Sequence, residues 1–370
     1  MISFSSLQEY SFSLGIEVLG VVDGEDLEEV KPCLEERFLK GYHTPWESTS
    51  LQERISPRFF LPGCKSIVVF ALPYLVPSQP ETPLLDTGPR GKIARCSQGV
   101  DYHWLVQKKA HQLVTFLHEK SPAEFSYKIL VDNTPLAERA LAVKAGSKVG
   151  QNLSIISQGF GSWIALGEIL TDLDLPLTCK PQEECHQCRQ CVDVCPTGAL
   201  SWGKAFNPLR CISFITQAPG VIPVEHRPAI KNWLYGCDLC QEVCPYNKNA
   251  PPSPLEELNH PLFPPEPALI PFLQITKKEF SLTAGMTAAK WRGRNLLLRN
   301  AVTALGNFPD NRATTFLAEM LISSPSLKLR CHSAWALGQM DTTLSREALF
   351  KARRLEENST VAQEICWALN

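Results

Sequence analysis

The chain has 370 residues, of which 44% are hydrophobic and 20% charged, and its formal net charge at pH 7 is -2. This length suggests two or three domains with cores of their own, and the near-neutral charge favours no class of partner. The longest apolar run, residues 67–76, is far shorter than the ~20 residues of a membrane-spanning helix, and no signal-peptide pattern is visible. We therefore expect a cytoplasmic protein that does not engage a membrane.

Residues 1–175 alternate between helical and strand patterns. Apolar residues at helical spacing and short β-branched runs predict these elements. The expected helices are 3–14, 25–41, 102–119 and 135–145, the last opened by a proline, and the expected strands are 18–22, 67–72 and 127–131, followed by apolar runs at 153–156 and 163–170. The alternation predicts an α/β domain, and no glycine-rich phosphate loop supports nucleotide binding.

Residues 176–248 carry two cysteine runs, each closed by a Cys-Pro pair. The runs are Cys185-x2-Cys188-x2-Cys191-x3-Cys195-Pro196 and Cys237-x2-Cys240-x3-Cys244-Pro245. This spacing matches the bacterial ferredoxin pattern for two [4Fe–4S] clusters, in which the last cysteine of each run reaches the other cluster. The crossing assigns Cys185, Cys188, Cys191 and Cys244 to cluster one, and Cys195, Cys237 and Cys240 to cluster two. Cys211 lies between the runs and is the natural fourth ligand of cluster two.

Zinc ribbons and a disulfide framework are the alternatives for these cysteines. Two CxxC pairs can bind zinc, but zinc sites do not call for the closing x3-Cys-Pro segments. Disulfides are disfavoured because no secretory context is visible. The remaining cysteines are expected to be small buried hydrophobic residues: Cys33, Cys64, Cys96, Cys179, Cys331 and Cys366.

The last third of the chain combines a proline-rich stretch with an internal repeat. Eight prolines between 251 and 271 predict an extended, semi-rigid linker over residues 249–275. Beyond it, Ala304-Leu305-Gly306, Ala336-Leu337-Gly338 and Ala368-Leu369-Asn370 recur every 32 residues. This period, with small residues at expected helix contacts, predicts HEAT-like stacked helical pairs over residues 276–370. The sequence leaves open whether the third repeat is complete.

A basic stretch lies at the entry to the repeats. Its members are Lys277, Lys278, Lys290, Arg292, Arg294 and Arg299. Basic residues concentrated in this way indicate a polyanionic partner, although a solvated helix face is the plainer interpretation of the charges alone.

Four segments of the chain resemble epoxyqueuosine reductase, in the same order over essentially its whole length. They are Leu61-Pro62-Gly63-x-Lys65-Ser66-Ile67, Arg95-x3-Gly99-x-Asp101-Tyr102-His103, Val131-Asp132-Asn133-Thr134-Pro135-Leu136-Ala137-Glu138-Arg139 with Ala145-Gly146, and Gly161-Ser162-Trp163-Ile164-Ala165-Leu166-Gly167-Glu168. The cysteine spacing, the Arg210-Cys211-Ile212-Ser213 segment and the repeats fit the same family. The resemblance implies a cobalamin-dependent iron–sulfur enzyme that converts epoxyqueuosine to queuosine at the wobble position of tRNA.

The resemblance also implies roles for individual residues. Asp132 matches the family's proton donor, whereas its position alone would favour a turn or capping aspartate. Electrons would pass from an external donor, such as a ferredoxin or flavodoxin, through two [4Fe–4S] clusters to cobalamin. The implied cobalamin contacts are Arg54, Cys96, Asp132, Asn152, Ile155, Leu166, Ser213 and Asp238. The basic residues become candidate tRNA phosphate contacts, and we expect a monomer.

Together these patterns predict a multidomain α+β/α protein. Its expected parts are an α/β cobalamin-binding domain (1–175), a ferredoxin-like 2[4Fe–4S] module (176–248), the linker (249–275) and HEAT-like α-helical repeats that bind tRNA (276–370). The chain departs from the family pattern at Cys96, and its loop at 146–152 is one residue shorter, with Gln151 in place of lysine.

Three other functions remain open at this point. A corrinoid reductase of a small molecule, similar to reductive dehalogenases, would not need the basic helical repeats. An electron-transfer protein that docks a partner through its repeats would bind iron and sulfide but no cobalamin. A purely structural role of the clusters is the third alternative.

Overall fold

The computed structural model describes residues 2–77, 88–178, 185 and 188–370, and the chain divides into two compact units. Unit 1 comprises Met1–Pro77, Gly99–Leu209 and Asp238–His260, and unit 2 comprises Ser78–Gln98, Arg210–Cys237 and Pro261–Asn370. Each unit is built from separate stretches of chain, so the units do not follow the domain boundaries expected from the sequence. In the described part of the chain, no helix is both long and apolar enough to cross a membrane.

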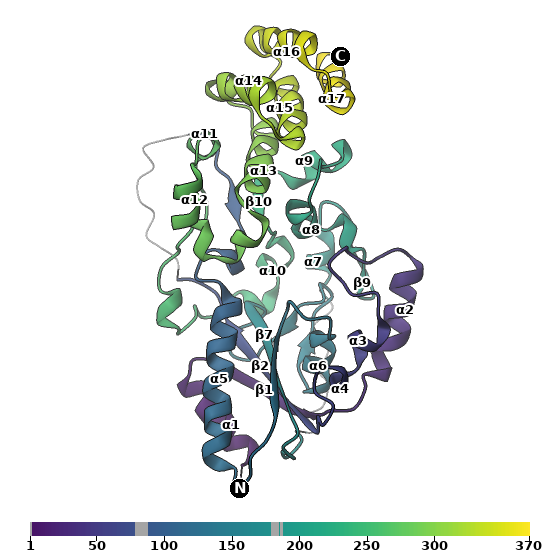
Figure 1. Ribbon diagram of the computed structural model, residues 1–370, viewed down its shortest axis with the longest axis vertical. Helices are drawn as coiled ribbons and strands as arrows, with labels where there is room; N and C mark the ends of the chain where they lie inside the picture. Colours follow the sequence, from purple (N-terminus) through teal and green to yellow (C-terminus); the bar gives the residue numbers. More distant parts are fainter. Residues whose placement is uncertain (1, 78–87, 179–184, 186–187) are drawn as a thin grey trace. The chain divides into compact units, whose positions relative to one another are not determined.

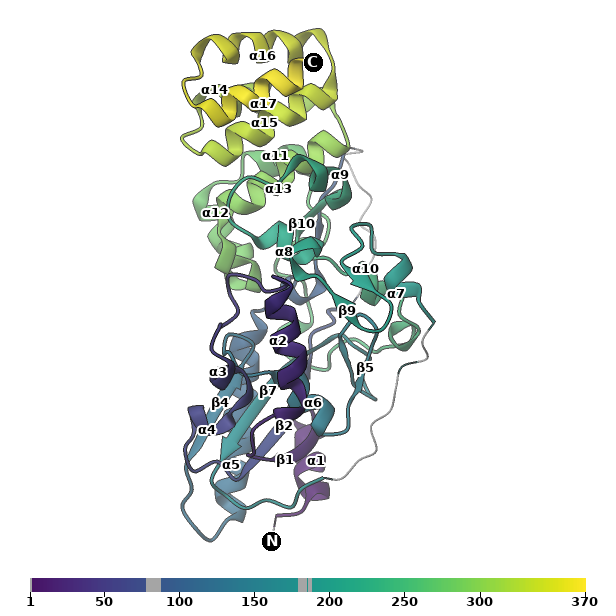
Figure 2. The same ribbon diagram turned by 90° about the vertical axis from the view of Figure 1, so that its right-hand side faces the viewer.

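Unit 1 is built on a four-stranded sheet in the order β1-β2-β7-β4; Figure 1 labels its first three strands, and Figure 2 labels all four. The strands are β1 (Glu17–Asp23), β2 (Ser66–Pro73), β7 (Ile164–Thr171) and β4 (Tyr127–Val131). Every neighbouring pair in this sheet is antiparallel. The mixed helix and strand content agrees with the α/β prediction, but the parallel crossovers typical of α/β folds are absent from this sheet. Alternating helical and strand patterns predict which elements a domain contains, but not whether its strands run parallel. Strand direction depends on how segments distant in sequence pair with one another.

Helices cover both faces of this sheet. Helix α5 (Tyr102–Lys120) lies on the face of Gly167, where a Cβ would come within 2.5 Å of Phe70 and 2.6 Å of Val106. Helix α6 (Glu138–Lys144) packs on the other face, in a core that includes Val69, Leu130 and Leu170. Because both faces are covered, all eight residues of β2 are buried. This explains why β2 appears in the sequence as a continuous apolar run.

Most sequence-predicted elements of unit 1 are confirmed within two residues. Helix α1 (Phe4–Ser13) begins after the capping residue Ser3, and β4 spans the expected residues. Helix α6 begins at Glu138, three residues after the proline expected to open it. The remaining elements of unit 1 are α2 (Lys31–Leu39), α3 (Leu51–Ile55), α4 (Pro57–Phe60), β5 (Lys148–Val149), β6 (Ile155–Ile156), α7 (Gln190–Asp193), β8 (Leu200–Ser201), β9 (Ala205–Phe206) and α10 (Leu239–Glu242).

Unit 2 ends in stacked antiparallel helices (Figure 2). They are α13 (Arg294–Asn307), α14 (Thr314–Ser323), α15 (Leu327–Met340), α16 (Thr343–Leu355) and α17 (Ser359–Leu369). The 32-residue recurrence falls on α13, α15 and α17, which pack in succession. The small residues of the repeat let these helices approach each other closely. A Cβ on Gly306 would lie 2.2 Å from Trp335, and one on Gly338 would lie 2.8 Å from Ala368. The repeat prediction is confirmed.

The proline-rich stretch is packed rather than extended, so the prediction of a linker over 249–275 is wrong. Its first part belongs to unit 1, where Leu255 and Leu258 are buried and Ser253 donates its N–H to the Leu75 carbonyl at 2.7 Å. Its second part belongs to unit 2 and buries Phe263 and Leu269. The apolar residues between the prolines decide this outcome, because their burial outweighs the stiffness that the prolines impose. The remaining elements of unit 2 are β3 (Lys92–Ile93), α8 (Ile212–Gln217), α9 (Arg227–Ile230), β10 (Trp233–Tyr235), α11 (Leu269–Leu273) and α12 (Lys277–Leu282).

Candidate active site and cluster site

Asp132 lies directly after β4, where the N-terminus of α5 meets the end of the sheet. His103 Nε2 lies 2.6 Å from Asp132 Oδ1, and the Tyr102 hydroxyl donates to Asp132 Oδ2. Tyr102 and His103 are the first residues of α5, which Asp101 caps by accepting the N–H of His103 at 3.1 Å. The Asp132 side chain remains 43% exposed. A carboxyl group is thus held in a fixed orientation while one side stays open to a ligand.

His103 is held between two carboxylates. Its Nδ1 lies 2.6 Å from Asp101 Oδ1, opposite the contact to Asp132. Burial by itself lowers the pKa of His103, but the hydrogen bonds and charges of Asp101 and Asp132 outweigh it and raise the pKa to about 9. The imidazole is therefore protonated at neutral pH, and it carries a proton on the nitrogen that faces Asp132.

This arrangement predicts a pH dependence of stability. Because the folded pKa of His103 exceeds that of an unfolded histidine, the stabilisation is fully present below about pH 6.5. It is lost as pH rises through about 9. We expect an NMR titration of the His103 ring to give a midpoint near 9, and Asp101→Asn to lower it. A His103 midpoint near 6.5, the ordinary value of a histidine, would contradict this assignment.

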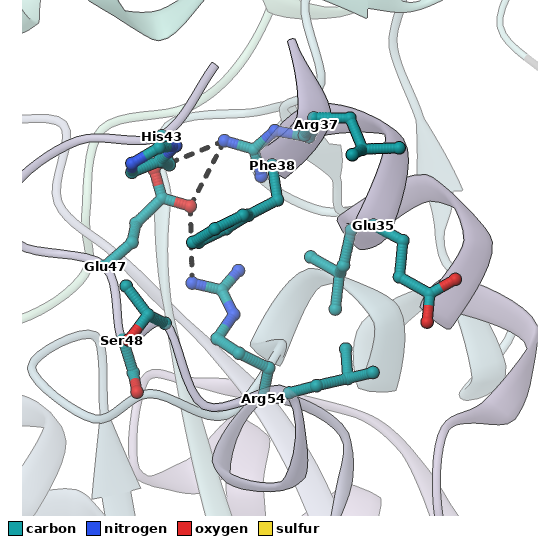
Figure 3. Close-up of a pocket in the computed structure, with 11 residues that line it drawn as sticks. Glu35, Arg37, Phe38, His43, Glu47, Ser48 and Arg54 are labelled. Carbon is teal, nitrogen blue, oxygen red and sulfur yellow. Dashed lines mark hydrogen bonds and ion pairs between the residues drawn. The ribbon is translucent and has the colours of Figure 1, made fainter. Parts of the chain in front are cut away.

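A cavity of about 420 Å³ opens beside α2 and α3 (Figure 3). In it, Glu47 bridges the guanidinium groups of Arg37 at 3.1 Å and Arg54 at 3.3 Å, and Phe38 stacks on His43 with ring centroids 4.5 Å apart. The lining residues are Leu34, Glu35, Arg37, Phe38, Leu39, His43, Glu47, Ser48, Thr49, Leu51 and Arg54. The cavity adjoins the segment after Asp132, because the Arg54 carbonyl accepts the N–H of Ala137 at 3.0 Å.

The cobalamin contacts implied by the sequence fall in both units. Arg54, Asp132, Asn152, Ile155, Leu166 and Asp238 lie in unit 1, and Cys96 and Ser213 lie in unit 2. Ile155 belongs to the buried core against which Leu166 packs. Asn152 follows the β5 strand and donates to the Cys240 carbonyl at 3.4 Å. Within unit 1 the structure therefore brings several of these residues to the Asp132 end of the sheet.

The unit 1 residues fit a corrinoid in their chemistry. The Nε atom of Arg54 is buried and has no hydrogen-bond partner among the described residues. A buried donor without a partner is costly, so a ligand with amide or phosphate acceptors would satisfy it. Leu166 is half-buried and would offer apolar surface to a bound macrocycle, whereas Ile155 is buried in the core behind it. The shortened loop is also ordered, since buried Gln151 accepts the N–H of Lys204 at 3.0 Å.

The cysteines assigned to cluster one lie together in unit 1. Cys185, Cys188, Cys191 and Cys244 line one small cavity together with the loop 150–152. Burial raises the pKa of Cys191, and the neighbouring charges of Cys244 and Cys188 raise it further. Thiols that crowd in this way favour a shared metal cluster, because bound iron compensates several thiolate charges at once.

Hydrogen bonds shift Cys195 toward its thiolate form. Burial raises its pKa, but hydrogen bonds from Thr197 and from the backbone N–H groups of Leu200 and Ala199 outweigh burial and lower it. Cys195 and Cys240 belong to unit 1, whereas Cys211 and Cys237 belong to unit 2. The ligand set of cluster two therefore remains a prediction from the spacing. Cys64 and Cys331 are buried as expected, but Cys33 is exposed, and Cys179 lies outside the described residues.

A buried polar network joins the second cysteine run to the sheet domain. The Asn247 side chain accepts the N–H of Ser162 at 2.7 Å and donates to the Ser162 hydroxyl at 2.8 Å. Gln241 donates to the Ser162 carbonyl at 2.8 Å. Gly161 has a φ of 60°, and a Cβ there would lie 2.3 Å from the Asn247 side chain. The network holds α10, which contains Cys240, against the segment that leads into β7.

The basic residues of unit 2 differ in what they can contact. Lys277, Lys278 and Lys290 are exposed, whereas Arg294 donates to the Ile275 carbonyl. Arg299 is only 1% exposed and donates to the carbonyls of Ile215, Thr216, Ala218 and Gly220 and to the Asn300 side chain. All its donors are used within unit 2, so its assignment as a tRNA phosphate contact is corrected to a structural role.

Several residues of this site were not singled out as functional by the sequence. Tyr102 and His103 were quoted only as part of a segment that resembles the family. The signal that could have identified them is the capping residue Asp101, because a histidine two residues later lies in the first turn of the helix. Glu138 and Glu168 were not named as site residues. The signal for Glu168 was a lone acid inside the apolar run 163–170.

Family comparisons match three parts of the chain. Residues 54–133 match the family described as "Epoxyqueuosine reductase QueG, DUF1730". Residues 184–247 match a 4Fe-4S double cluster binding domain, and residues 294–370 match HEAT repeats. The double-cluster match supports the iron–sulfur interpretation over a zinc ribbon or a disulfide framework.

Relatives of known identity match nearly the whole chain. The epoxyqueuosine reductase of Bacillus cereus is 36% identical over 96% of this chain and 94% of its own length, and that of Escherichia coli K12 is 32% identical over 90% and 88%. A crystal structure of an epoxyqueuosine reductase with an epoxyqueuosine-modified tRNA-Tyr stem loop matches with a TM-score of 0.92 and 34% identity, covering 99% of this chain and 97% of the other. A Bacillus subtilis structure, described as having an aspartate catalytic loop swung out of the active site, matches with a TM-score of 0.91 and 33% identity over 99% and 97%. The chain belongs to the epoxyqueuosine reductase family.

Proposed function

We propose that this oxidoreductase converts epoxyqueuosine in tRNA to queuosine, with Asp132 as the group that delivers a proton to the epoxide oxygen. The activity follows from family membership over nearly the full chain. The observation that supports the proton role is the chain of contacts Asp101–His103–Asp132, which ends at a partly exposed carboxyl group. The catalytic loop of the Bacillus subtilis relative also carries an aspartate.

The chemistry requires acid at the epoxide. Conversion of an epoxide to an alkene consumes two electrons and two protons, and the oxygen leaves as water. A carboxylic acid that protonates this oxygen as the C–O bond breaks typically accelerates such a step ~10²–10⁴-fold. His103 holds a proton at Nε2, 2.6 Å from Asp132 Oδ1, and can pass it to that carboxyl group. Tyr102 holds the second carboxyl oxygen and fixes its orientation.

The proposed cofactors are two [4Fe–4S] clusters and cobalamin. Arg54, Asn152, Ile155 and Leu166 are the unit 1 residues proposed to hold the corrinoid beside Asp132. Bound cobalamin supplies low-valent cobalt, which can deliver electrons to the carbon framework of the substrate. The residues of this chain orient the substrate, exclude water and supply the proton. An external one-electron donor, such as a ferredoxin or flavodoxin, is proposed to recharge the clusters.

Mass spectrometry tests the function directly. Epoxyqueuosine-bearing tRNA is incubated without oxygen with the protein, cobalamin and a strong reductant. Loss of one oxygen from the modified nucleoside is the expected result. If the oxygen is lost equally well without added cobalamin from protein free of corrinoid, the proposed cofactor is wrong. If it is retained in every arm with fully cluster-loaded protein, the activity is wrong.

The exposed lysines at the start of α12 are proposed phosphate contacts. We expect Lys277→Ala/Lys278→Ala to weaken stem-loop binding and to reduce the slope of log K against log salt by about one per lost contact. Lys120→Ala, at the exposed end of α5, is the matched control. Binding measured over a salt series checks this prediction. An affinity and slope equal to those of the control would place the tRNA elsewhere.

A further inference from the structure

Glu168 is a carboxyl group enclosed by the core of unit 1. It lies on β7, its exposure is 0%, and both carboxyl oxygens are buried without a hydrogen-bond partner among the described residues. Its partners across the sheet are Val69 of β2 and Leu130 of β4, both buried and apolar. A lone carboxylate is very costly in such surroundings, so the group is held as the neutral acid. Burial raises the pKa of Glu168 well above its ordinary value, and the charge of Asp132 raises it further.

Strand register places Glu168 near Asp132. Glu168 pairs with Leu130, and β4 ends one residue later at Val131, opposite Gly167. Asp132 is the first residue after the strand, so it lies beside the end of the β4–β7 pair that carries Glu168. Diagonal neighbours of this kind are about 7–8 Å apart at the backbone, within reach of long side chains.

A second carboxyl group faces the same region. Glu138, at the start of α6, has a buried Oε1 atom without a partner among the described residues. Burial raises the pKa of Glu138 well above its ordinary value, with further contributions from Glu168 and Asp132, and the charges of Arg139 and Arg54 oppose them. The charged or titratable groups around this region are therefore Asp132, Glu138, Arg54 and Arg139, with His103 and Tyr102 on the far side of Asp132.

We propose that Glu168 is a positioning residue that stores a proton behind Asp132 and returns it to Asp132 within each turnover. This inference rests on the proposed role of Asp132. It explains why a core strand carries an acid that hydrogen-bonds to none of the described residues, since a glutamate without a function at that site would only destabilise the fold.

The proton count of the reaction requires such a store or an equivalent path. Asp132 receives the Nε2 proton of His103 and transfers it to the epoxide oxygen as the first C–O bond breaks. As the second C–O bond breaks, the alkene forms and the oxygen takes a second proton and leaves as water. The two electrons come from the reductant of the established reaction. Asp132 is then a carboxylate again, and the Nε2 proton of His103 has been used, so a second proton must reach Asp132 before water leaves. The Glu168 O–H supplies that proton, and the resulting carboxylate recovers one from solvent between turnovers.

Glu168→Gln removes the acidic proton but keeps the shape of the side chain. Glutamine has the volume and neutrality of the protonated acid but cannot release a proton. In cluster-loaded protein with cobalamin, we expect unchanged stem-loop affinity, a kcat about 10²-fold lower, and a rate that recovers with the concentration of small buffer acids. Glu168→Asp, which keeps an acid, is expected to retain more activity than Glu168→Gln. Glu257→Gln, which removes a surface partner of Lys108, is the control.

Other outcomes would overturn the proposal. A Glu168→Gln enzyme with wild-type kcat and pH profile would remove Glu168 from proton transfer, as would a loss confined to stem-loop affinity. An Asp132→Asn enzyme is assayed in parallel. Full activity in Asp132→Asn would mean that the proposed role of Asp132 fails, whereas full activity in Glu168→Gln alone would mean that only the Glu168 proposal fails. If Glu168→Gln folds poorly, infrared spectra of the wild-type protein decide. A carboxylic acid C=O band that persists at neutral pH supports a stored proton, and its absence contradicts one.

Discussion

Asp132→Asn is expected to lower kcat for epoxyqueuosine reduction ~10²–10⁴-fold, the usual loss when a positioned acid is removed. Asparagine keeps the size of the side chain and can still accept the hydrogen bond from His103 Nε2, which lies 2.6 Å from Oδ1 in the wild-type protein. It cannot carry a proton to the epoxide oxygen. Stem-loop affinity and the visible spectra of both cofactors should therefore remain near wild type, while single-turnover formation of queuosine slows.

Asp172→Asn is the matched control for this variant. Asp172 follows β7 at the opposite end of the same sheet and accepts the N–H of Ser126 at 2.8 Å. It shares the strand-end position of Asp132 but lies at the other end of the β4–β7 pair from Tyr102 and His103. Undiminished turnover in Asp132→Asn, or an equal loss in Asp172→Asn, would show that Asp132 serves the fold rather than the reaction.

Cys191→Ser is expected to abolish cluster one. Cys191 lines the same small cavity as Cys185, Cys188 and Cys244, and a serine oxygen is a poor substitute for a thiolate at iron. Iron and sulfide should fall from about eight to about four atoms per chain, as two four-iron clusters become one. Turnover with a reductant that enters through the clusters should be lost.

The control for the cluster prediction is Cys33→Ser. Cys33 is an exposed cysteine of α2, outside both cysteine runs. It should retain full iron and full turnover. Iron and sulfide analysis, together with electron paramagnetic resonance of the reduced protein, checks the result. Full iron content in Cys191→Ser would show that Cys191 is not a cluster ligand.

Much of the site could be predicted because its chemistry lies in local spacing. The cysteine runs specify a double-cluster module through intervals of two and three residues, and residues 184–247 match such a domain. The recurrence of Gly306 and Gly338 predicted the helical repeats because close helix packing has a fixed period. These features depend on neighbours a few residues away, which a sequence displays directly.

Other predictions were wrong where the environment is assembled from distant segments. Arg299 looked like a phosphate contact from its charge alone, yet its guanidinium group is buried among carbonyls of residues 215–220, about 80 positions earlier. The proline-rich stretch looked like a linker, yet its leucines and phenylalanines complete the cores of both units. The type of a residue limits the contacts it can make, but the residues that pack around it decide which contacts it makes.

The sequence by itself predicted the four cysteines that line one cavity, the repeat architecture and Asp132 as the residue to test. Only the tertiary structure decided that His103 lies between Asp101 and Asp132, and that the buried Glu168 carboxyl group hydrogen-bonds to none of the described residues. The physical reason is that protonation depends on burial and on charges within a few ångströms. Strand pairing and helix packing set those distances, and both join residues that lie far apart along the chain.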